Sequence, residues 1–217
     1  MSEPIRNVFR AIPVFQNVRP VDFSAEDLPD HPLPALTEWI LAGLAAGQPE
    51  PHAMSLCTVA ADGTPSSRVL LCKDIDAHRL YFATHSDSRK GVAIAANPRV
   101  SVNFYWSANG RQVQITGRAQ SAGREASERD FAERGRGSQL SAHLHRAEPP
   151  SGHEEILAEH ERLSGAYPDV VPCPETWTLY GITPDEAEFW QASPDRIHQR
   201  VRYTRSGDTW QKGYLWP

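Results

Sequence analysis

Hydrophobic residues along the chain recur at two different periods. Leu36, Trp39, Ile40 and Leu44 follow the three- and four-residue spacing of an amphipathic helix that begins near Pro34. Many later segments are short and alternate between apolar and polar residues, which predicts half-buried strands. The predicted strands cover residues 54–60, 66–73, 79–84, 99–106, 111–120, 176–182, 186–190, 200–205 and 209–216. Further helices are predicted at residues 88–97, 123–145 (broken near Gly135 and Gly137) and 153–164.

Turn signals separate the predicted strands. Asp62-Gly63 and Asn109-Gly110 each stand between two strands, and such pairs favour tight hairpin turns. Short antiparallel strands with a few helices indicate an α+β fold, mainly β, built as a small barrel or roll. Residues 1–33 contain scattered prolines and short apolar runs, so we expect an N-terminal arm that lies over a surface or a partner. Residues 34–217 are expected to form one domain.

Composition and charge narrow the function classes. The chain has 217 residues and a formal net charge of −5, so no overall positive field indicates a nucleic-acid partner. The N-terminus lacks the apolar region of a signal peptide, and no apolar run reaches transmembrane length. Cys57, Cys72 and Cys173 are odd in number and show no CxxC spacing, which indicates reduced thiols. We therefore expect a cytoplasmic protein that binds neither nucleic acid nor a membrane.

Positive charges nevertheless gather in four short segments. Arg89 and Lys90 follow Ser88 in the first turn of a predicted helix, the end whose dipole repels cations. A bound phosphate would explain them, because free N–H groups and both side chains would contact it; two solvent-exposed side chains are the alternative. The other segments are Arg68 with Lys73, 134-RGRGSQ-139 and 196-RIHQR-200. Each of these three segments also has an ordinary structural explanation: a solvent-exposed strand end, a flexible helix junction and a charged edge strand, respectively. Four such clusters in an acidic protein nevertheless indicate local anion sites.

Several common site motifs are missing from the chain. The absence of GxxxxGK[ST] and of a strand–GxGxxG–helix pattern excludes P-loop and Rossmann sites. No HxxxH or HExxH motif occurs, so we predict no metal site and interpret His143 and His145 as surface or packing residues. No GxSxG or cysteine–histidine signature indicates a hydrolase.

Together these segments resemble the pyridoxine/pyridoxamine 5′-phosphate oxidase family of FMN enzymes, from about residue 34 to residue 217. The matching motifs are 68-RVLLCK-73, 88-SRK-90, 97-NPRV-100, 111-RQV-113, 134-RGRGSQ-139 and 188-EFWQASPDRIHQRVRYTR-205. The last run is the most specific, because EFWQ, DRxH and RxRYxR occur together in family order. The resemblance implies an FMN-binding split β-barrel with peripheral helices and a dimerisation-type region at about 175–217. It also implies a homodimer with FMN at the interface.

Family position also implies the site residues. The expected FMN-binding residues are Arg68, Val69, Leu70, Leu71, Cys72, Lys73, Ala83, Thr84, Arg89, Lys90, Gln112, Trp190 and Arg200. Among them Arg68, Arg89 and Lys90 would hold the FMN phosphate, whereas the residues alone favour burial of Cys72 as a small apolar side chain. The expected substrate-binding residues are Lys73, Asp130, Arg134, Ser138, Arg196 and His198. Arg196 and His198 would flank the substrate as the catalytic pair.

The implied reaction is hydride transfer from a substrate carbon to flavin N5, followed by reoxidation by O₂ to give H₂O₂. The leading substrate is pyridoxine or pyridoxamine 5′-phosphate. Three departures from the family pattern concern the substrate: Asp130 replaces a tyrosine, Ala147-Glu148 replaces a Gln-Ser pair, and Tyr214 replaces an arginine. They favour, as an alternative, a phenazine-biosynthesis type of FMN oxidase acting on a reduced tricyclic aromatic. A non-catalytic protein that binds flavin or pyridoxal phosphate is the third hypothesis.

Overall fold

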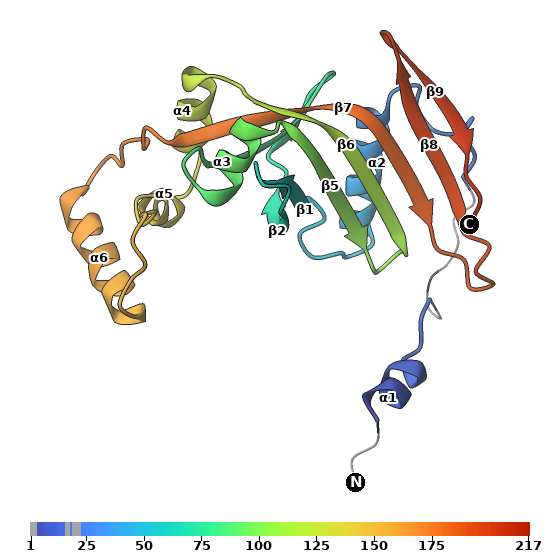
Figure 1. The fold of residues 1–217 in the computed structure, drawn as a ribbon, viewed down its shortest axis with the longest axis horizontal. Helices are drawn as coiled ribbons and strands as arrows, with labels where there is room; N and C mark the ends of the chain where they lie inside the picture. The colour runs from blue at the N-terminus through green and yellow to red at the C-terminus, as the bar shows by residue number, and fades with distance from the viewer. Residues whose placement is uncertain (1–3, 16–17, 19–22) are drawn as a thin grey trace.

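The structure, a computed structural model, describes residues 4–15, 18 and 23–217 (Figure 1). Its helices are α1 (Ile5–Ala11), α2 (Pro32–Ala45), α3 (Arg89–Ala96), α4 (Arg124–Ala132), α5 (Arg136–Ala142) and α6 (His153–Ala166). Its strands are β1 (Ala53–Val59), β2 (Pro65–Leu71), β3 (Asp74–Ile75), β4 (Leu80–His85), β5 (Arg99–Trp106), β6 (Arg111–Ser121), β7 (Trp177–Gln191), β8 (Gln199–Ser206) and β9 (Thr209–Tyr214).

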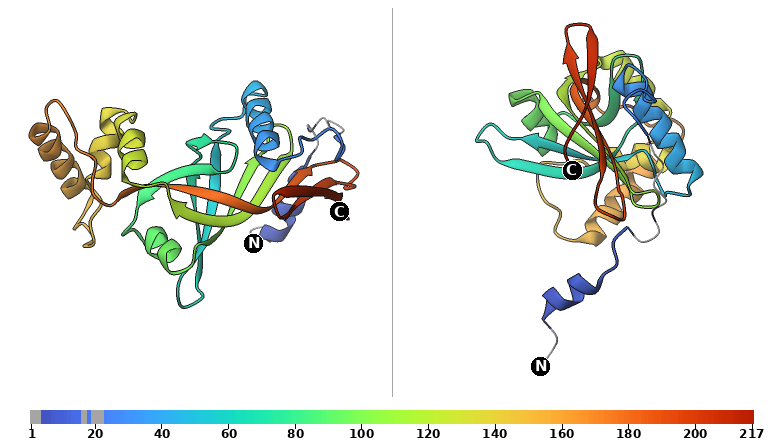
Figure 2. Two further views of the ribbon diagram at one scale, coloured as in Figure 1. Left: turned by 90° about the horizontal axis from the view of Figure 1, so that it is seen from above. Right: turned by 90° about the vertical axis from the view of Figure 1, so that its right-hand side faces the viewer.

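The strands form one antiparallel sheet in the order β2-β1-β5-β6-β7-β4-β3, and β8 joins β7 to β9. Figure 2 shows that this sheet is strongly twisted and that α2 lies along one side of it. The α+β, mainly β, fold expected from the sequence is confirmed. The hairpin turns are confirmed as well, since Gly63 and Gly110 both adopt the positive φ that such turns require.

The main core lies between α2 and the sheet. The helix begins where His31 Nδ1 accepts a hydrogen bond from the backbone N–H of Leu33 (3.2 Å), with a proline in its first turn. Its Trp39 ring packs edge-to-face on Phe189 of β7, with 5.0 Å between the ring centroids. Val102 of β5 and Ile115 of β6 are fully buried in the same core. The helical spacing in the sequence therefore identified most of the face of α2 that meets the sheet, since Leu36 and Trp39 are buried and Ile40 is partly buried. Leu44, expected on the same face, is instead exposed near the end of the helix.

One long strand replaces two predicted ones. The sequence predicts separate strands at 176–182 and 186–190, whereas β7 continues without a break for 15 residues. Pro184 indicates a break because it has no N–H to donate. In the structure a β-bulge accommodates it: the register shifts between Thr116 and Gly117 of β6, and Pro184 lies opposite Gly117. A Cβ on Gly117 would come within 2.2 Å of the backbone oxygen of Thr183, so only glycine fits there.

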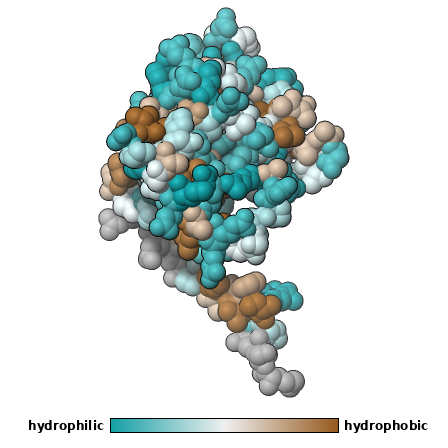
Figure 3. Space-filling view, turned by 90° about the vertical axis from the view of Figure 1, so that its left-hand side faces the viewer, coloured by the Kyte–Doolittle hydropathy of each residue, from teal (hydrophilic) through white to brown (hydrophobic). Residues whose placement is uncertain are grey.

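Strand β7 links two ends of the molecule (Figure 1). Helices α4, α5 and α6 gather near its start around a second small core that includes Phe131, Leu140 and Trp177. The β8–β9 hairpin extends from its far end. Figure 3 views the helical end, whose surface is mostly hydrophilic.

Helix α1 stands away from this body and has no buried residue (Figures 1 and 3). It falls within the N-terminal arm expected at 1–33, of which residues 1–3, 16–17 and 19–22 lie outside the described part. Helix α2 already begins at Pro32, and β2 ends at Leu71, two residues before the predicted end. No helix in the described ranges combines the length and the apolar character needed to cross a membrane.

Candidate functional site

A cluster of cations surrounds the start of α3. The Ser88 side chain caps this helix by accepting a hydrogen bond from the N–H of Gly91 (3.3 Å). A Cβ on Gly91 would lie 2.3 Å from the Ser86 backbone oxygen, so the glycine lets the helix start pack directly on the preceding turn. Lys90 Nζ is half-buried and donates to Thr84 Oγ1 at 3.0 Å. Burial lowers the pKa of Lys90, and the positive charge of Arg68 lowers it further.

Arg68 reaches this cluster from β2 and is held by three neutral acceptors. Its guanidinium donates to Leu56 O (3.1 Å), Thr58 Oγ1 (3.0 Å) and Ser66 Oγ (2.6 Å). Burial lowers the pKa of Arg68, and the Arg89 charge acts in the same direction. Within the described residues none of the ion pairs involves Arg68, Arg89 or Lys90. Three cations at a helix N-terminus without a carboxylate partner suit a phosphate group.

Three further residues expected at the FMN site form a row across the sheet. Gln112 of β6 lies opposite Trp190 of β7, which lies opposite Arg200 of β8. Arg200 is fixed in this row because its Nε donates to Glu188 (2.8 Å) and its Nη1 to the Trp216 backbone oxygen (2.6 Å). The structure therefore brings together Gln112, Trp190 and Arg200 as one surface.

The expected catalytic pair lies beside this row, in the turn between β7 and β8. The His198 ring contacts Trp190, with 4.8 Å between centroids, and Arg196 lies 5.2 Å from the ring centroid of Phe15. His198 Nδ1 accepts a hydrogen bond from the Ser193 N–H (3.0 Å). Burial lowers the pKa of His198, and the Arg196 charge adds to this effect. His198 is therefore a neutral imidazole near pH 7 with its proton on Nε2, a hydrogen-bond donor.

The remaining residues expected to bind the substrate gather at the opposite end of β7, around Trp177. Asp130 of α4 forms an ion pair with Lys73 (3.2 Å) and accepts a hydrogen bond from Trp177 Nε1 (3.1 Å). Arg134 stacks over the Trp177 ring at 4.3 Å and donates to the backbone oxygen of Ser138 (2.9 Å). Lys73 and Asp130 line a cavity of about 650 Å³. The sequence identified the ionic groups but missed Trp177, whose only signal is that a buried indole N–H needs an acceptor.

The two ends of β7 lie far apart in one chain. Thr84, which contacts Lys90, pairs with Thr178 near the start of β7, whereas Trp190 lies twelve residues further along the same strand. At about 3.3 Å per residue this separation is about 40 Å of strand. A single chain therefore does not bring the α3 cluster and the Gln112–Trp190–Arg200 row to the same small ligand.

The other expected FMN residues lie on β2, directly after it and on β4. Val69 and Leu71 are exposed, with 65% and 41% of their surfaces accessible, and Leu70 and Ala83 pack against the two cores. Burial raises the pKa of the Cys72 thiol to about 11, as expected for a small buried residue. The outward side chains of β2 thus form an apolar edge beside Arg68.

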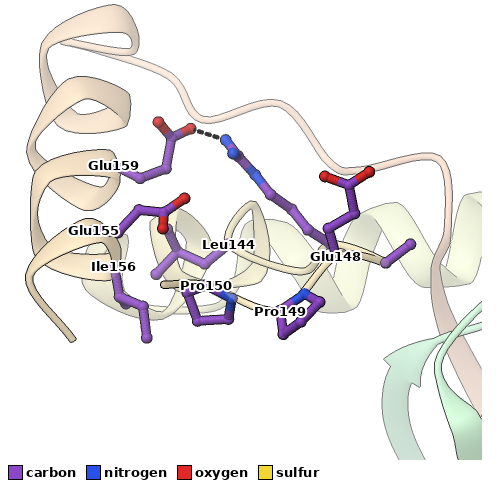
Figure 4. A pocket seen from close by; sticks show the side chains of 9 residues that line it. Leu144, Glu148, Pro149, Pro150, Glu155, Ile156 and Glu159 are labelled. Atoms are coloured by element: carbon purple, nitrogen blue, oxygen red, sulfur yellow. Dashed lines mark hydrogen bonds and ion pairs between the residues drawn. The ribbon is translucent and has the colours of Figure 1, made fainter. Parts of the chain in front are cut away.

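The Ala147-Glu148 departure lies elsewhere, in a cavity of about 310 Å³ between α6 and the segment 144–150 (Figure 4). Glu148, Glu155 and Glu159 line it, and Arg146 is paired with Glu159. This acidic lining is unsuited to a phosphate.

Histidines that are distant in sequence meet beside the α3 cluster. The His85 and His145 rings stack with 4.3 Å between centroids, and His145 Nε2 contacts Asp87 Oδ1 at 2.9 Å. These three residues offer ligand atoms within 4.8 Å of one another, a grouping that sequence spacing did not reveal. His143 packs on Tyr167 and contacts the Pro172 backbone oxygen (2.7 Å).

His85 makes the stability of the protein depend on pH. Burial lowers its pKa from 6.5 to about 4, and the neighbouring His145 contributes to the shift. The unfolded chain therefore binds a proton that the folded chain refuses, and stability falls as the pH decreases from about 6.5 to about 4. We expect a loss of about 3 kcal/mol across this window, measured by denaturant unfolding. His85→Asn should remove most of this dependence of the unfolding free energy on pH. His153→Asn, at an exposed position of α6, should leave it unchanged. If the unmodified protein and both variants lose the same stability between these pH values, His85 is not its source.

The twisted antiparallel sheet and its cation-lined ends define the class: a split β-barrel protein with sites suited to anionic ligands. Residues 41–164 match the family profile described as pyridoxamine 5′-phosphate oxidase. Residues 177–217 match the profile described as the pyridoxine 5′-phosphate oxidase C-terminal dimerisation region. The chain belongs to the pyridoxamine 5′-phosphate oxidase family.

Individual relatives agree with this membership. The chain is 43% identical over 192 residues to the pyridoxine/pyridoxamine 5′-phosphate oxidase of Alcanivorax borkumensis, covering 88% of this chain and 92% of the relative. It is 39% identical to the enzyme of that name from Burkholderia lata, covering 84% and 86%. PhzG from Burkholderia lata 383, solved in complex with tetrahydrophenazine-1-carboxylic acid, superposes with a TM-score of 0.87 at 31% identity, covering 93% of this chain and 100% of PhzG.

Proposed function

We propose that this protein is an FMN-dependent oxidase of pyridoxine or pyridoxamine 5′-phosphate. The observation that carries the proposal is the α3 cluster, in which Arg68, Arg89 and Lys90 have no carboxylate partner within the described residues. Arg68 and Lys90 are partly buried next to each other, with the exposed Arg89 beside them, and holding like charges together is unfavourable unless an anion joins them. A phosphate ester at the start of α3 supplies that anion, and FMN carries one.

The active enzyme is proposed to be a homodimer with two shared sites. About 40 Å of β7 separates the α3 cluster from the Gln112–Trp190–Arg200 row. A two-fold axis places the row of one subunit beside the α3 cluster of the other. The match of residues 177–217 to a dimerisation region supports this arrangement.

Each group then has a separate task. Bound FMN supplies hydride acceptance at N5 from a substrate carbon, with reoxidation by O₂ to H₂O₂. Arg68, Arg89 and Lys90 hold the phosphate, while the outward edge of β2 excludes water. Lys73, Arg134 and Ser138 bind the anionic group of the substrate. Arg196 orients the substrate, and the neutral His198 donates a hydrogen bond from Nε2 rather than acting as the base.

A phenazine-type oxidase is the second candidate. The fold match to PhzG and the Asp130 carboxylate favour it. Against it, the identity to the Burkholderia lata relative named for the vitamin B6 phosphates is 39%, whereas that to PhzG is 31%. A non-catalytic flavin or pyridoxal-phosphate binding protein would share the cation cluster but form no H₂O₂.

The decisive test is flavin bleaching without O₂. The protein is loaded with FMN and mixed with pyridoxine 5′-phosphate, pyridoxamine 5′-phosphate or a reduced phenazine carboxylate. We expect rapid bleaching by the two vitamin B6 phosphates and H₂O₂ formation when O₂ is admitted. Bleaching by the phenazine alone would establish the second candidate, and FMN binding without bleaching by any of the three would refute the oxidase.

A further inference from the structure

Asp130 is held firmly in the proposed substrate site. Its side chain is only 9% exposed, and its two oxygens are engaged by Lys73 Nζ (3.2 Å) and Trp177 Nε1 (3.1 Å). Lys73, in contrast, is 31% exposed and lines the cavity. An anion that enters to contact Lys73 therefore arrives beside a fixed carboxylate.

The charges facing Asp130 come from several elements. Those lining the cavity are Lys73, Asp74, Asp76, Arg79 and Tyr81 from the β2–β4 region, Arg129 and Asp130 from α4, and Glu133 at the C-terminal cap of α4. Arg129 is paired with Glu125 on the surface, whereas Asp76 keeps its negative charge while it accepts a hydrogen bond from the Tyr81 hydroxyl. Cys173 also lies near Asp130, and burial raises the pKa of its thiol.

Arg134 supplies the second cation. Its guanidinium lies over the ring of Trp177, whose N–H donates to Asp130, and it lies outside the lining of the cavity. Burial lowers the pKa of Arg134, and the Asp130 charge opposes this shift. Its Nε is buried without a hydrogen-bond partner in the described structure.

We propose that Asp130 makes this site selective for a substrate whose anionic group carries a single negative charge: a carboxylate or a singly protonated phosphate ester. The inference rests on the proposed function, in which this cavity receives the substrate. Around Trp177, Lys73 and Arg134 contribute two positive charges and Asp130 removes one. The other lining charges, Asp74, Asp76 and Glu133 against Arg79, add no positive excess, so the site offers an anion at most one net positive charge. A phosphate dianion adds a second negative charge, which Asp130 and the other carboxylates lining the cavity repel.

Equilibrium binding tests the inference without turnover. The ligands are 4-deoxypyridoxine 5′-phosphate, which lacks the oxidisable group, and the same ring with a carboxymethyl group instead of the phosphate. A phosphate ester loses its second proton near pH 6, so it is mainly a monoanion at about pH 5.5 and a dianion at about pH 8. Titrations of the ring cancel in the comparison because both ligands share it. Calorimetry on the FMN-loaded protein gives both dissociation constants.

We expect the phosphate ligand to bind about 10-fold more tightly at the lower pH and the carboxylate ligand about equally at both. Asp130→Asn keeps an oxygen for Trp177 and should tighten phosphate binding at about pH 8 by about 10-fold. In turnover it should lower the KM for pyridoxine 5′-phosphate with little change in kcat. As a control, Glu128→Gln removes a charge from the same helix but outside the cavity. It should change neither the dissociation constant of the phosphate ligand nor the KM.

Other results would overturn the inference. The inference is wrong if the unmodified protein binds the phosphate ligand equally well at both pH values. This result counts even if Asp130→Asn does not fold. Weaker binding by a folded Asp130→Asn would show that the carboxylate only positions Trp177. If the phosphate ligand binds about 10-fold more tightly at the lower pH but no substrate bleaches the flavin, the role of Asp130 stands and the proposed oxidase activity is refuted. If the vitamin B6 phosphates bleach the flavin but the phosphate ligand binds equally at both pH values, the oxidase stands and the role of Asp130 is refuted.

Discussion

Replacing Lys90 by methionine is expected to weaken FMN binding by about 10- to 100-fold, equivalent to about 1.5–3 kcal/mol for a hydrogen bond to a charged group. The FMN-free protein should be as stable as before, or slightly more stable. Burial and the Arg68 charge already disfavour the protonated lysine, so a methionine of similar length relieves both costs. Quenching of flavin fluorescence gives the affinity, and thermal unfolding of the FMN-free protein gives the stability.

The opposite directions of these two effects make the test specific. A residue with only a structural role would lose stability and affinity together. Arg118→Met, on an exposed position of β6, removes one positive charge and should leave FMN binding unchanged. If Lys90→Met binds FMN as tightly as the unmodified protein, the α3 cluster is not the phosphate site.

At an FMN concentration that saturates only the unmodified site, two variants with little activity are expected to restore each other when their subunits are mixed. Lys90→Met damages one half of the shared site and Arg200→Met the other half, which lies about 40 Å away along β7. In a heterodimer one site carries both substitutions and the other carries neither. Random reassortment makes half of the dimers mixed, so activity should recover to about a quarter of the unmodified level.

Matched mixtures control this experiment. Lys90→Met mixed with Arg89→Met should stay inactive, because both substitutions fall in the same half. Each variant alone, taken through the same dissociation and reassociation, gives the baseline. If the Lys90→Met and Arg200→Met mixture also stays at baseline, both halves belong to one subunit or to different sites.

Local patterns were sufficient for most of the fold. The spacing of Leu36 and Trp39 marks the buried face of α2 because a helix places such residues on one side. Asn109-Gly110 marks a hairpin because a tight turn requires positive φ at Gly110. The continuity of β7 was missed, since the break indicated by Pro184 is resolved by Gly117 on another strand. No local pattern contains that pairing.

The candidate site also combines features that local sequence reveals with features that depend on long-range contacts. Arg89 and Lys90 were identifiable from the sequence because a helix start and its charges are neighbours along the chain. The pairing of Lys73 with Asp130 was not, because residues so distant in sequence meet only when α4 packs beside the sheet. The stack of His85 on His145 depends on a similar long-range contact.

The sequence by itself determined the element types, the family and the identity of the cationic groups, because these depend on residues close together in the chain. Only the tertiary structure decided that the α3 cluster and the Gln112–Trp190–Arg200 row lie at opposite ends of β7. It also decided that a buried carboxylate neutralises Lys73. Both results depend on strand register and burial, which arise when distant segments pack together.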